Sequence, residues 1–588
     1  MTSSAITGRL DATPAAIGAG MQKARRSGGP FEPRVAFLVS MAIYLALGAY
    51  LTFGTTTVIG DAWSRVGNAY YVLFSRDPHL AAIGIVWNPL PSLAMMPVLL
   101  FSVIWPPLVA QGFAATVVSA VFMAATVAVM RGLLQDIGLR FAPRCILTLL
   151  FALNPMILLY GSNGLSEGPF LLFVLLAVRS LLRWERRDAG ADLVIAGLAL
   201  GLAYLTRYEA VAVAGAAIGG VGILSFLRAH GPVRGRLTAG AADALLVAFP
   251  FVVSFGGWSL ASWIIVGSPF ATFTSVYGNT SQVGIAGTGI TGAVGDTAMA
   301  RIIFFGREVA GLAPGLAPLV ALTLLVMLVR RSVRALVPIA IFGSALAFSG
   351  WALASGSSFG WLRFAIMSIP LAAVLGGMLL APRYGLERLA GSQSGEPAPG
   401  DPTPLPAGKG AGLASSLVRG ALVVVVVASL AVGFPTALRS MSDNKLGREE
   451  AGQLEALQDP SVGPTTQYGR VVVIAQEAAS YIDGLHLGMG TVLVDVATGY
   501  PIVLASRNPQ QFVITPDRDF PQTLRDPGAF GIRFLLVPRD TGYAAVDALT
   551  RTYPGLYEQG SGFGPMVQQF GLDSDTIVWR LYELKTGS

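Results

Sequence analysis

The feature that most constrains the fold is a series of apolar runs, each about 17–25 residues long, between residues 35 and 434. Runs of this length match the hydrocarbon core of a bilayer, which is roughly 30 Å thick. Only 12% of the 588 residues are charged, against about 25% in soluble proteins. The sequence therefore predicts a polytopic α-helical membrane protein.

Loop charge orients these runs in the membrane. The segment 89–105 is apolar but contains or adjoins five prolines, and each proline removes a backbone donor. If this segment does not cross, the arginine-rich connections "RSLLRWERRD", "RAHGPVRGR" and "RRSVR" share one side, as the positive-inside rule requires. We therefore predict a long first external loop over 55–107, a cytoplasmic N-terminus and an external C-terminus. About 11 spans are expected, at residues 35–54, 108–130, 145–160, 168–183, 192–206, 209–226, 241–265, 309–329, 335–354, 364–381 and 418–434.

Composition divides the rest of the chain. Residues 1–33 are small and polar, which indicates a disordered cytoplasmic N-terminus, and the Pro/Gly-rich segment 382–417 predicts a cytoplasmic linker. The last span, 418–434, is followed by an extracytoplasmic α/β domain over 440–588. In this domain we predict strands at "RVVVIA", "GTVLVDV", "FGIRFLLVP" and "DTIVWRLYEL", and helices at "AQEAASYIDG" and "GYAAVDALTRTYP".

Charge and cysteine content exclude several classes of protein. The net charge of +7 does not indicate nucleic-acid binding, because much of the excess lies in short loops between spans. The single cysteine excludes an intramolecular disulfide framework and a cysteine-based metal cluster.

A few charged residues lie at the predicted outer ends of spans. Charged side chains at or near the membrane cost free energy, so each of them calls for a structural or functional explanation. They come from distant parts of the sequence, and the predicted topology brings them to one face of the membrane: Asp61, Glu167, Arg207, Glu209 and Arg363. Singly, each has a simple structural explanation, because arginines snorkel to the interface and Arg207 can pair with Glu209. Together with a long first loop, they favour a site at the membrane surface.

The order of features resembles the GT-C superfamily of integral-membrane glycosyltransferases, in particular the protein O-mannosyltransferases and lipid A aminoarabinose transferases. The resemblance covers residues 35–380. We therefore predict a GT-C-like transmembrane catalytic domain over residues 34–381. It rests on "GDA" after the first span, "WNPLPSL", "NPMILLYGSNGLSEGPF", "LTRYEA" and an Arg-Phe pair before a late span. Many mannosyltransferases carry Asp-Glu at the first acidic position, whereas this chain has Asp61-Ala62.

The resemblance implies a polyprenyl-phosphate sugar donor, an acceptor on the outer face of the cytoplasmic membrane and inversion at the anomeric carbon. The acceptor is a glycan, a lipid or a protein. Such chemistry needs a carboxylate base for the acceptor hydroxyl and positive groups at the leaving phosphate. We assign Asp61 as the base, and Arg363 and Arg207 as the phosphate ligands, since guanidinium suits bidentate contacts with phosphate.

The remaining candidates have supporting roles. Glu167, Asp77 and His79 are predicted to orient the acceptor or the sugar, and Glu209 and Arg65 are further candidates. A divalent metal held by Asp61 and Glu167 is an open alternative, although hard cations want several oxygen ligands. No other cofactor is expected.

Other functions are open at this stage. A secondary transporter or lipid flippase would show internal repeats and broken helices near the bilayer midplane, and a non-catalytic scaffold would display the external domain. Asp61 itself has a structural alternative, because an aspartate there can be the N-cap of the helix that follows.

Overall fold

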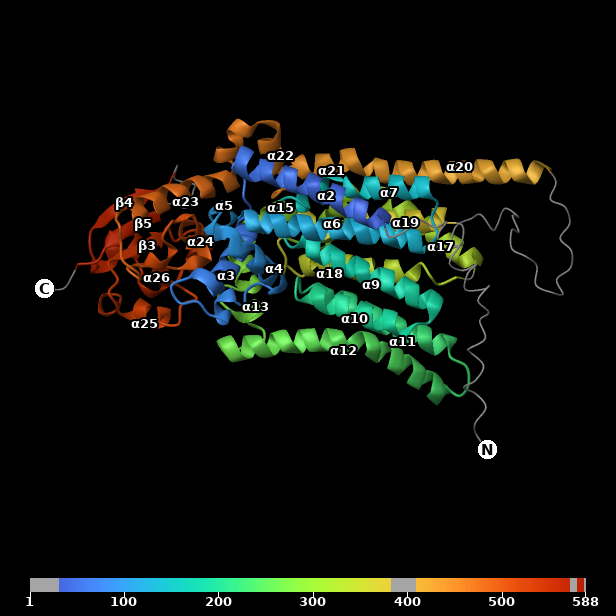
Figure 1. Ribbon diagram of the computed structural model, residues 1–588, viewed down its shortest axis with the longest axis horizontal. Coiled ribbons are helices and arrows are strands. Elements are labelled where there is room, and N and C mark those ends of the chain that lie inside the picture. The colour runs from blue at the N-terminus through green and yellow to red at the C-terminus, as the bar shows by residue number, and fades with distance from the viewer. Residues whose placement is uncertain (1–30, 331, 382–408, 572–578, 586–588) are drawn as a thin grey trace.

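The computed structural model describes residues 31–330, 332–381, 409–571 and 579–585. It shows a bundle of long helices with a smaller α/β domain covering one end (Figure 1). Residues 1–30 of the predicted N-terminal segment 1–33 lie outside the described residues. Residues 382–408 of the predicted linker 382–417 also lie outside them.

Long apolar helices form the bundle, because in lipid every backbone N–H and C=O must be paired internally. Seven helices among the described residues are long and apolar enough to cross a membrane, and the bent pair α16–α17, with 83° between its two parts, makes up to eight. The chain is thus a multi-pass membrane protein, and the count of 11 spans stays a prediction. The bundle helices are α2 (Phe31–Ala49), which continues into η1 (Tyr50–Gly54), α6 (Phe113–Asp136), α7 (Phe141–Ala152), α8 (Pro155–Tyr160), α9 (Glu167–Arg187), α10 (Gly190–Tyr204), α11 (Ala210–Arg228), α12 (Val233–Val266), α16 (Ala298–Leu312), α17 (Leu316–Arg330), α18 (Leu336–Ala354), α19 (Ser368–Leu380), α20 (Lys409–Ala431) and α21 (Gly433–Ser442).

The first loop is a folded layer of short helices between the bundle and the C-terminal domain (Figure 1). The proline-rich segment 89–105 forms α4 and η3, whose 14 residues extend about 21 Å, too short to span a bilayer. The helices of this loop are α3 (Gly60–Phe74), η2 (Leu80–Ile83), α4 (Leu90–Leu99), η3 (Leu100–Val103) and α5 (Pro107–Ala110).

Two further connections contribute short helices near the same end of the bundle. Between α12 and α16 the chain forms α13 (Ala271–Thr274), α14 (Asn279–Ile285) and α15 (Gly287–Val294), and before α19 it forms the 3-10 turn η4 (Leu362–Ala365).

The C-terminal domain contains a mixed five-stranded sheet of order β2-β1-β3-β5-β4. Strands β2 (Phe512–Ile514), β1 (Val492–Val494) and β3 (Phe534–Pro538) are parallel, whereas β5 (Trp579–Glu583) is antiparallel to both β3 and β4 (Met566–Phe570). Its main helices are α22 (Ala451–Gln458), α23 (Gln467–Gly484), α24 (Val496–Ala505), α25 (Phe520–Arg525), α26 (Ala548–Thr552) and α27 (Leu556–Gln559).

The strand predicted at "RVVVIA" is wrong. These residues lie inside α23, whose N-cap Thr466 accepts a hydrogen bond from the Gly469 amide at 3.1 Å. The cap fixes the start of a helix, and buried Val472, Ile474 and Ala475 pack into the main core, so tertiary packing overrides the β propensity of the valines. Strands β1, β3 and β5 lie within predicted strand segments, while β2 and β4 were not predicted.

Candidate functional site

The structure brings together the five charged residues that the topology placed on one face. Asp61 lies in the first turn of α3 and Glu167 begins α9. Arg207 and Glu209 lie in the turn between α10 and α11, and Arg363 lies in η4. Helix α3 lies at the end of the bundle nearest the C-terminal domain (Figure 1), and ion pairs join the other four residues to Asp61 in one network.

Arg363 is the centre of this cluster. Its Nη2 donates to the Asp61 carboxylate at 3.0 Å, while its Nε lies 3.1 Å from Glu449 and 3.8 Å from Glu167. The side chain is only 8% exposed. A buried guanidinium needs such partners, because unpaired charge in the interior costs several kcal/mol.

Arg207 forms the second half of the cluster. Its Nε and Nη2 donate to Glu209 at 3.0 and 2.6 Å, and its Nη1 contacts Glu167. Burial alone would lower the pKa of Arg207, but the carboxylates of Glu209 and Glu167 outweigh it and raise that pKa above its ordinary value. Glu167 therefore lies between the two arginines and joins them into one network.

Asp61 differs from the other carboxylates of the cluster in its accessibility. Its side chain is 31% exposed, whereas those of Glu167, Glu209 and Glu449 are 1%, 7% and 7% exposed. It is not a helix cap, because the N-cap of α3 is Ile59 and forms no side-chain cap hydrogen bond. Asp61 is thus an oriented carboxylate that a substrate can reach.

Glu449 is the site residue that the sequence analysis missed. It follows the last bundle helix in "GREEAG", and only the neighbouring Arg448 and Glu450 make this segment unusually charged. Burial raises the pKa of Glu449 to about 8. The rest of the segment is also fixed, since the Tyr160 hydroxyl donates to Glu450 and Arg448 donates to the Gly360 carbonyl at 2.6 Å.

Two tyrosines of the C-terminal domain, Tyr500 and Tyr543, lie near Asp61. A Cβ at Gly60 would lie 2.8 Å from the Tyr500 hydroxyl, so a larger residue there would push this hydroxyl away from the start of α3. The Tyr500 ring also packs edge-on against Trp63 at 6.3 Å between centroids. Burial, with a smaller contribution from Asp61, raises the pKa values of Tyr500 and Tyr543.

Arg65 lies beside the cluster without entering its network of ion pairs. Its Nη1 donates to the backbone carbonyl of Asp61 at 3.3 Å, and its guanidinium lies 4.5 Å from the Trp87 ring centroid. Burial lowers the pKa of Arg65 to about 10. Its contacts support the first turn of α3.

Asp77 and His79 do not join the cluster but lie where the first loop contacts the C-terminal domain. Asp77 forms an ion pair with Arg518 of the C-terminal domain, and the neighbouring Arg76 donates to Asp517 at 3.0 and 3.1 Å. His79 Nδ1 lies 2.7 Å from the Asp77 carbonyl. We call these contacts between 76–79 and 517–519 the interdomain clasp. These contacts join the first loop to the C-terminal domain. Among the described residues, no ion pair or hydrogen bond joins Asp77 or His79 to the cluster, so their role in orienting the substrate stays a prediction.

The described residues contain no group of three or more histidine, cysteine, aspartate or glutamate side chains arranged to hold a metal ion. Asp61 and Glu167 are instead directed at the arginines. A divalent metal held by Asp61 and Glu167 stays a prediction.

Comparison with solved structures gives likenesses to membrane glycosyltransferases. The aminoarabinose transferase ArnT from Cupriavidus metallidurans, bound to undecaprenyl phosphate, aligns over 92% of this chain and 97% of its own, with 14% identity and a TM-score of 0.48. The Archaeoglobus fulgidus oligosaccharyltransferase, with Zn and sulfate, aligns over 86% of this chain and 68% of its own, with 11% identity and a TM-score of 0.38.

A third likeness is partial. The Saccharomyces cerevisiae protein O-mannosyltransferase Pmt1-Pmt2, bound to the sugar donor, aligns over 42% of this chain and 36% of its own, with 17% identity and a TM-score of 0.28. No protein-family model and no curated protein sequence matches the chain. All three neighbours are GT-C enzymes, the superfamily that the sequence resembles. These superpositions are loose, and the side chains of the cluster are what indicates the function of this chain.

Proposed function

We propose that the chain is an inverting glycosyltransferase that moves a sugar from a polyprenyl-phosphate donor to an acceptor on the outer face of the cytoplasmic membrane. The observation that carries the proposal is the accessible Asp61 carboxylate, held by Arg363 at 3.0 Å where the bundle meets the C-terminal domain. General-base catalysis requires an oriented carboxylate that the acceptor can reach.

The reaction follows from this arrangement. The acceptor hydroxyl oxygen attacks the anomeric carbon, the bond from that carbon to the phosphate oxygen breaks, and Asp61 takes the hydroxyl proton. The polyprenyl phosphate leaves with the electron pair of the broken bond. Arg363 orients the Asp61 carboxylate, and the buried partners Glu167 and Glu449 hold Arg363 in place.

The acceptor class is less defined than the donor class. A glycan, a lipid and a protein all present a hydroxyl that Asp61 could deprotonate, and the C-terminal domain that lies over Asp61 is the part of the chain best placed to select among them. A transporter is disfavoured, since the clustered charges lie at helix ends rather than at the midplane, where transporter sites form.

The test compares the parental protein with Asp61→Asn in a donor panel. Each purified protein is incubated with polyprenyl-phosphate sugars and candidate acceptors, and the released polyprenyl phosphate is measured. Asparagine keeps the size of the side chain but cannot take a proton, so we expect the transfer rate to fall by about 10²–10⁴. Donor binding and thermal stability should stay close to parental. A stable variant that transfers sugar at the parental rate would remove Asp61 as the base.

A further inference from the structure

The arginines of the cluster are already neutralised by the chain itself. Two guanidiniums, those of Arg207 and Arg363, face four carboxylates, those of Asp61, Glu167, Glu209 and Glu449. A phosphate that approaches Arg363 would meet carboxylate oxygens and would have to displace them. Arg65 lies outside these ion pairs, but it is only 6% exposed and its guanidinium lies over the Trp87 ring. A lipid phosphate therefore needs a more accessible cation at this end of the bundle, and that need rests on the function proposed above.

A cavity of about 320 Å³ lies between α14, α15, α16 and the loop after α18. Its size is within the range of small-ligand sites. Its lining contains one guanidinium and several uncharged polar groups over an apolar floor, and it includes no aspartate or glutamate. The lining residues that matter here are Asn279, Val283, Ile290, Thr291, Arg301 and Ser357.

Arg301 is the cation of this cavity, and it is held by the backbone. Its Nε donates to the Gly295 carbonyl at 3.1 Å. Gly356 has φ +76°, and a Cβ there would lie 2.7 Å from Arg301 Nη1, so glycine is needed for the guanidinium to lie against this loop. Among the described parts of the chain, no carboxylate forms an ion pair with Arg301, and its charge is available to a ligand.

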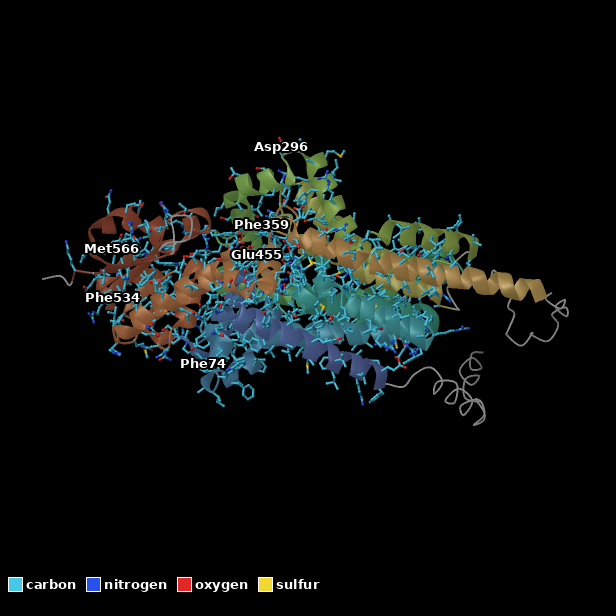
Figure 2. All side chains as sticks on the ribbon, turned by 90° about the horizontal axis from the view of Figure 1, so that it is seen from above. Phe74, Asp296, Phe359, Glu455, Phe534 and Met566 are labelled. Atoms are coloured by element: carbon cyan, nitrogen blue, oxygen red, sulfur yellow. The ribbon has the colours of Figure 1, made fainter. Side chains whose placement is uncertain are left out.

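The cavity is connected to the cluster by one loop. Val283 and Ile290 share a small hydrophobic core with Phe359, the Phe359 ring stacks on Trp361 at 5.7 Å, and Arg363 lies 5.9 Å from the Trp361 ring centroid. Figure 2 shows Phe359 toward the body of the molecule and Asp296, from the segment between α15 and α16, at its outer edge. A ligand in the cavity would thus lie beside the loop that positions Arg363.

The surroundings of Arg301 suit an amphiphile. The helices on either side of the cavity also expose apolar side chains: three on α16 and one on α18 are more than half exposed, as is ordinary for helices that face acyl or isoprenoid chains. They are Met299 at 65%, Ile302 at 52%, Ile303 at 51% and Trp351 at 63%. An anionic head at Arg301 and an apolar chain along these residues describe one ligand class.

We propose that the Arg301 cavity binds the phosphate of the polyprenyl-phosphate lipid. Guanidinium gives phosphate a charged, bidentate partner, while the hydroxyl groups of Thr291 and Ser357 and the amide of Asn279 can donate to further oxygens. In this arrangement Arg301 anchors the lipid phosphate, and Arg363 remains the partner of Asp61.

The test measures binding of undecaprenyl phosphate to the full chain in nanodiscs, without turnover. Arg301→Gln should weaken binding about 10- to 100-fold, the loss expected for a charge-assisted hydrogen-bonding partner, and Arg301→Lys should recover part of it. Gly287→Val should weaken binding too, because a side chain at this lining position meets no other atom within 4 Å and would extend into open space. Arg307→Gln, at an exposed arginine on the same helix outside the cavity, is the matched control and should bind like the parent.

The outcomes separate the sources of phosphate. Phosphatidylglycerol and inorganic phosphate should compete poorly with undecaprenyl phosphate. Equal competition by phosphatidylglycerol would overturn the assignment to the polyprenyl lipid, and parental binding by a folded Arg301→Gln would overturn the site. If Arg301→Gln abolishes binding while the parental protein shows no sugar transfer with any donor, the cavity stands and the proposed transferase function fails.

Discussion

The two ends of the helix bundle carry opposite charge excesses. At the end away from the C-terminal domain, each of three carboxylates pairs with two arginines at 2.6 to 2.9 Å. At the end beneath that domain, four carboxylates surround two arginines. The arginine-rich end contains Glu32 with Arg131 and Arg144, Asp136 with Arg179 and Arg183, and Glu185 with Arg228 and Arg334.

The difference separates charges that serve topology from charges that need another explanation. An arginine excess is what the positive-inside rule expects of cytoplasmic loops. A buried excess of carboxylates has no topological purpose and adds desolvation cost. The carboxylate-rich end is therefore the end to which we assign chemistry.

A large stability effect should come from removing Arg207, which pairs with two buried carboxylates. Arg207→Met leaves Glu167 and Glu209 without that partner, and we expect a loss of about 3–5 kcal/mol in the free energy of unfolding. The matched change at the other end is Arg228→Met. Arg228 is 35% exposed, and Glu185 keeps Arg334, so the expected loss is below about 1 kcal/mol. Chemical unfolding of both variants in mixed micelles measures the difference, and equal losses would refute the distinction between the two ends.

A smaller effect is expected at the interdomain clasp. Arg76→Ala leaves the Asp517 side chain, which is 1% exposed, without its charged partner, at a cost of about 1–3 kcal/mol. Arg518→Ala removes an arginine whose side chain is 71% exposed, and it should destabilise the protein less than Arg76→Ala does. Both variants should keep parental sugar-transfer rates if the clasp only joins the domains. A selective loss of acceptor affinity in either variant would instead support the predicted role of Asp77 and His79.

Much of the cluster was predictable because charges at the outer ends of spans are few and costly. Asp61, Glu167, Arg207, Glu209 and Arg363 stand out against apolar helices, and the positive-inside rule brings them to one side. Glu449 does not stand out in this way, since it follows the last bundle helix, where acidic residues are ordinary.

The C-terminal domain limited the prediction in two further respects. The pairing of Asp77 with Arg518 joins residues 441 positions apart, and no local pattern encodes such docking. The valines of α23 favour a strand by propensity, but the Thr466 cap and burial of one face make them helical. Periodicity over so short a run did not distinguish the two.

The most direct test of the account is to relate sugar transfer to the orientation of the protein in sealed proteoliposomes. In a Cys145→Ser background, Thr541→Cys marks the C-terminal domain and Val233→Cys marks the arginine-rich end, and both positions are exposed. A membrane-impermeant maleimide gives the fraction of molecules with each end outward. A short-chain polyprenyl-phosphate sugar and acceptor are then added outside only. We predict that the transfer rate rises in proportion to the fraction labelled at Thr541→Cys. A rate that follows the Val233→Cys fraction instead would contradict the assignment of catalysis to the carboxylate-rich end.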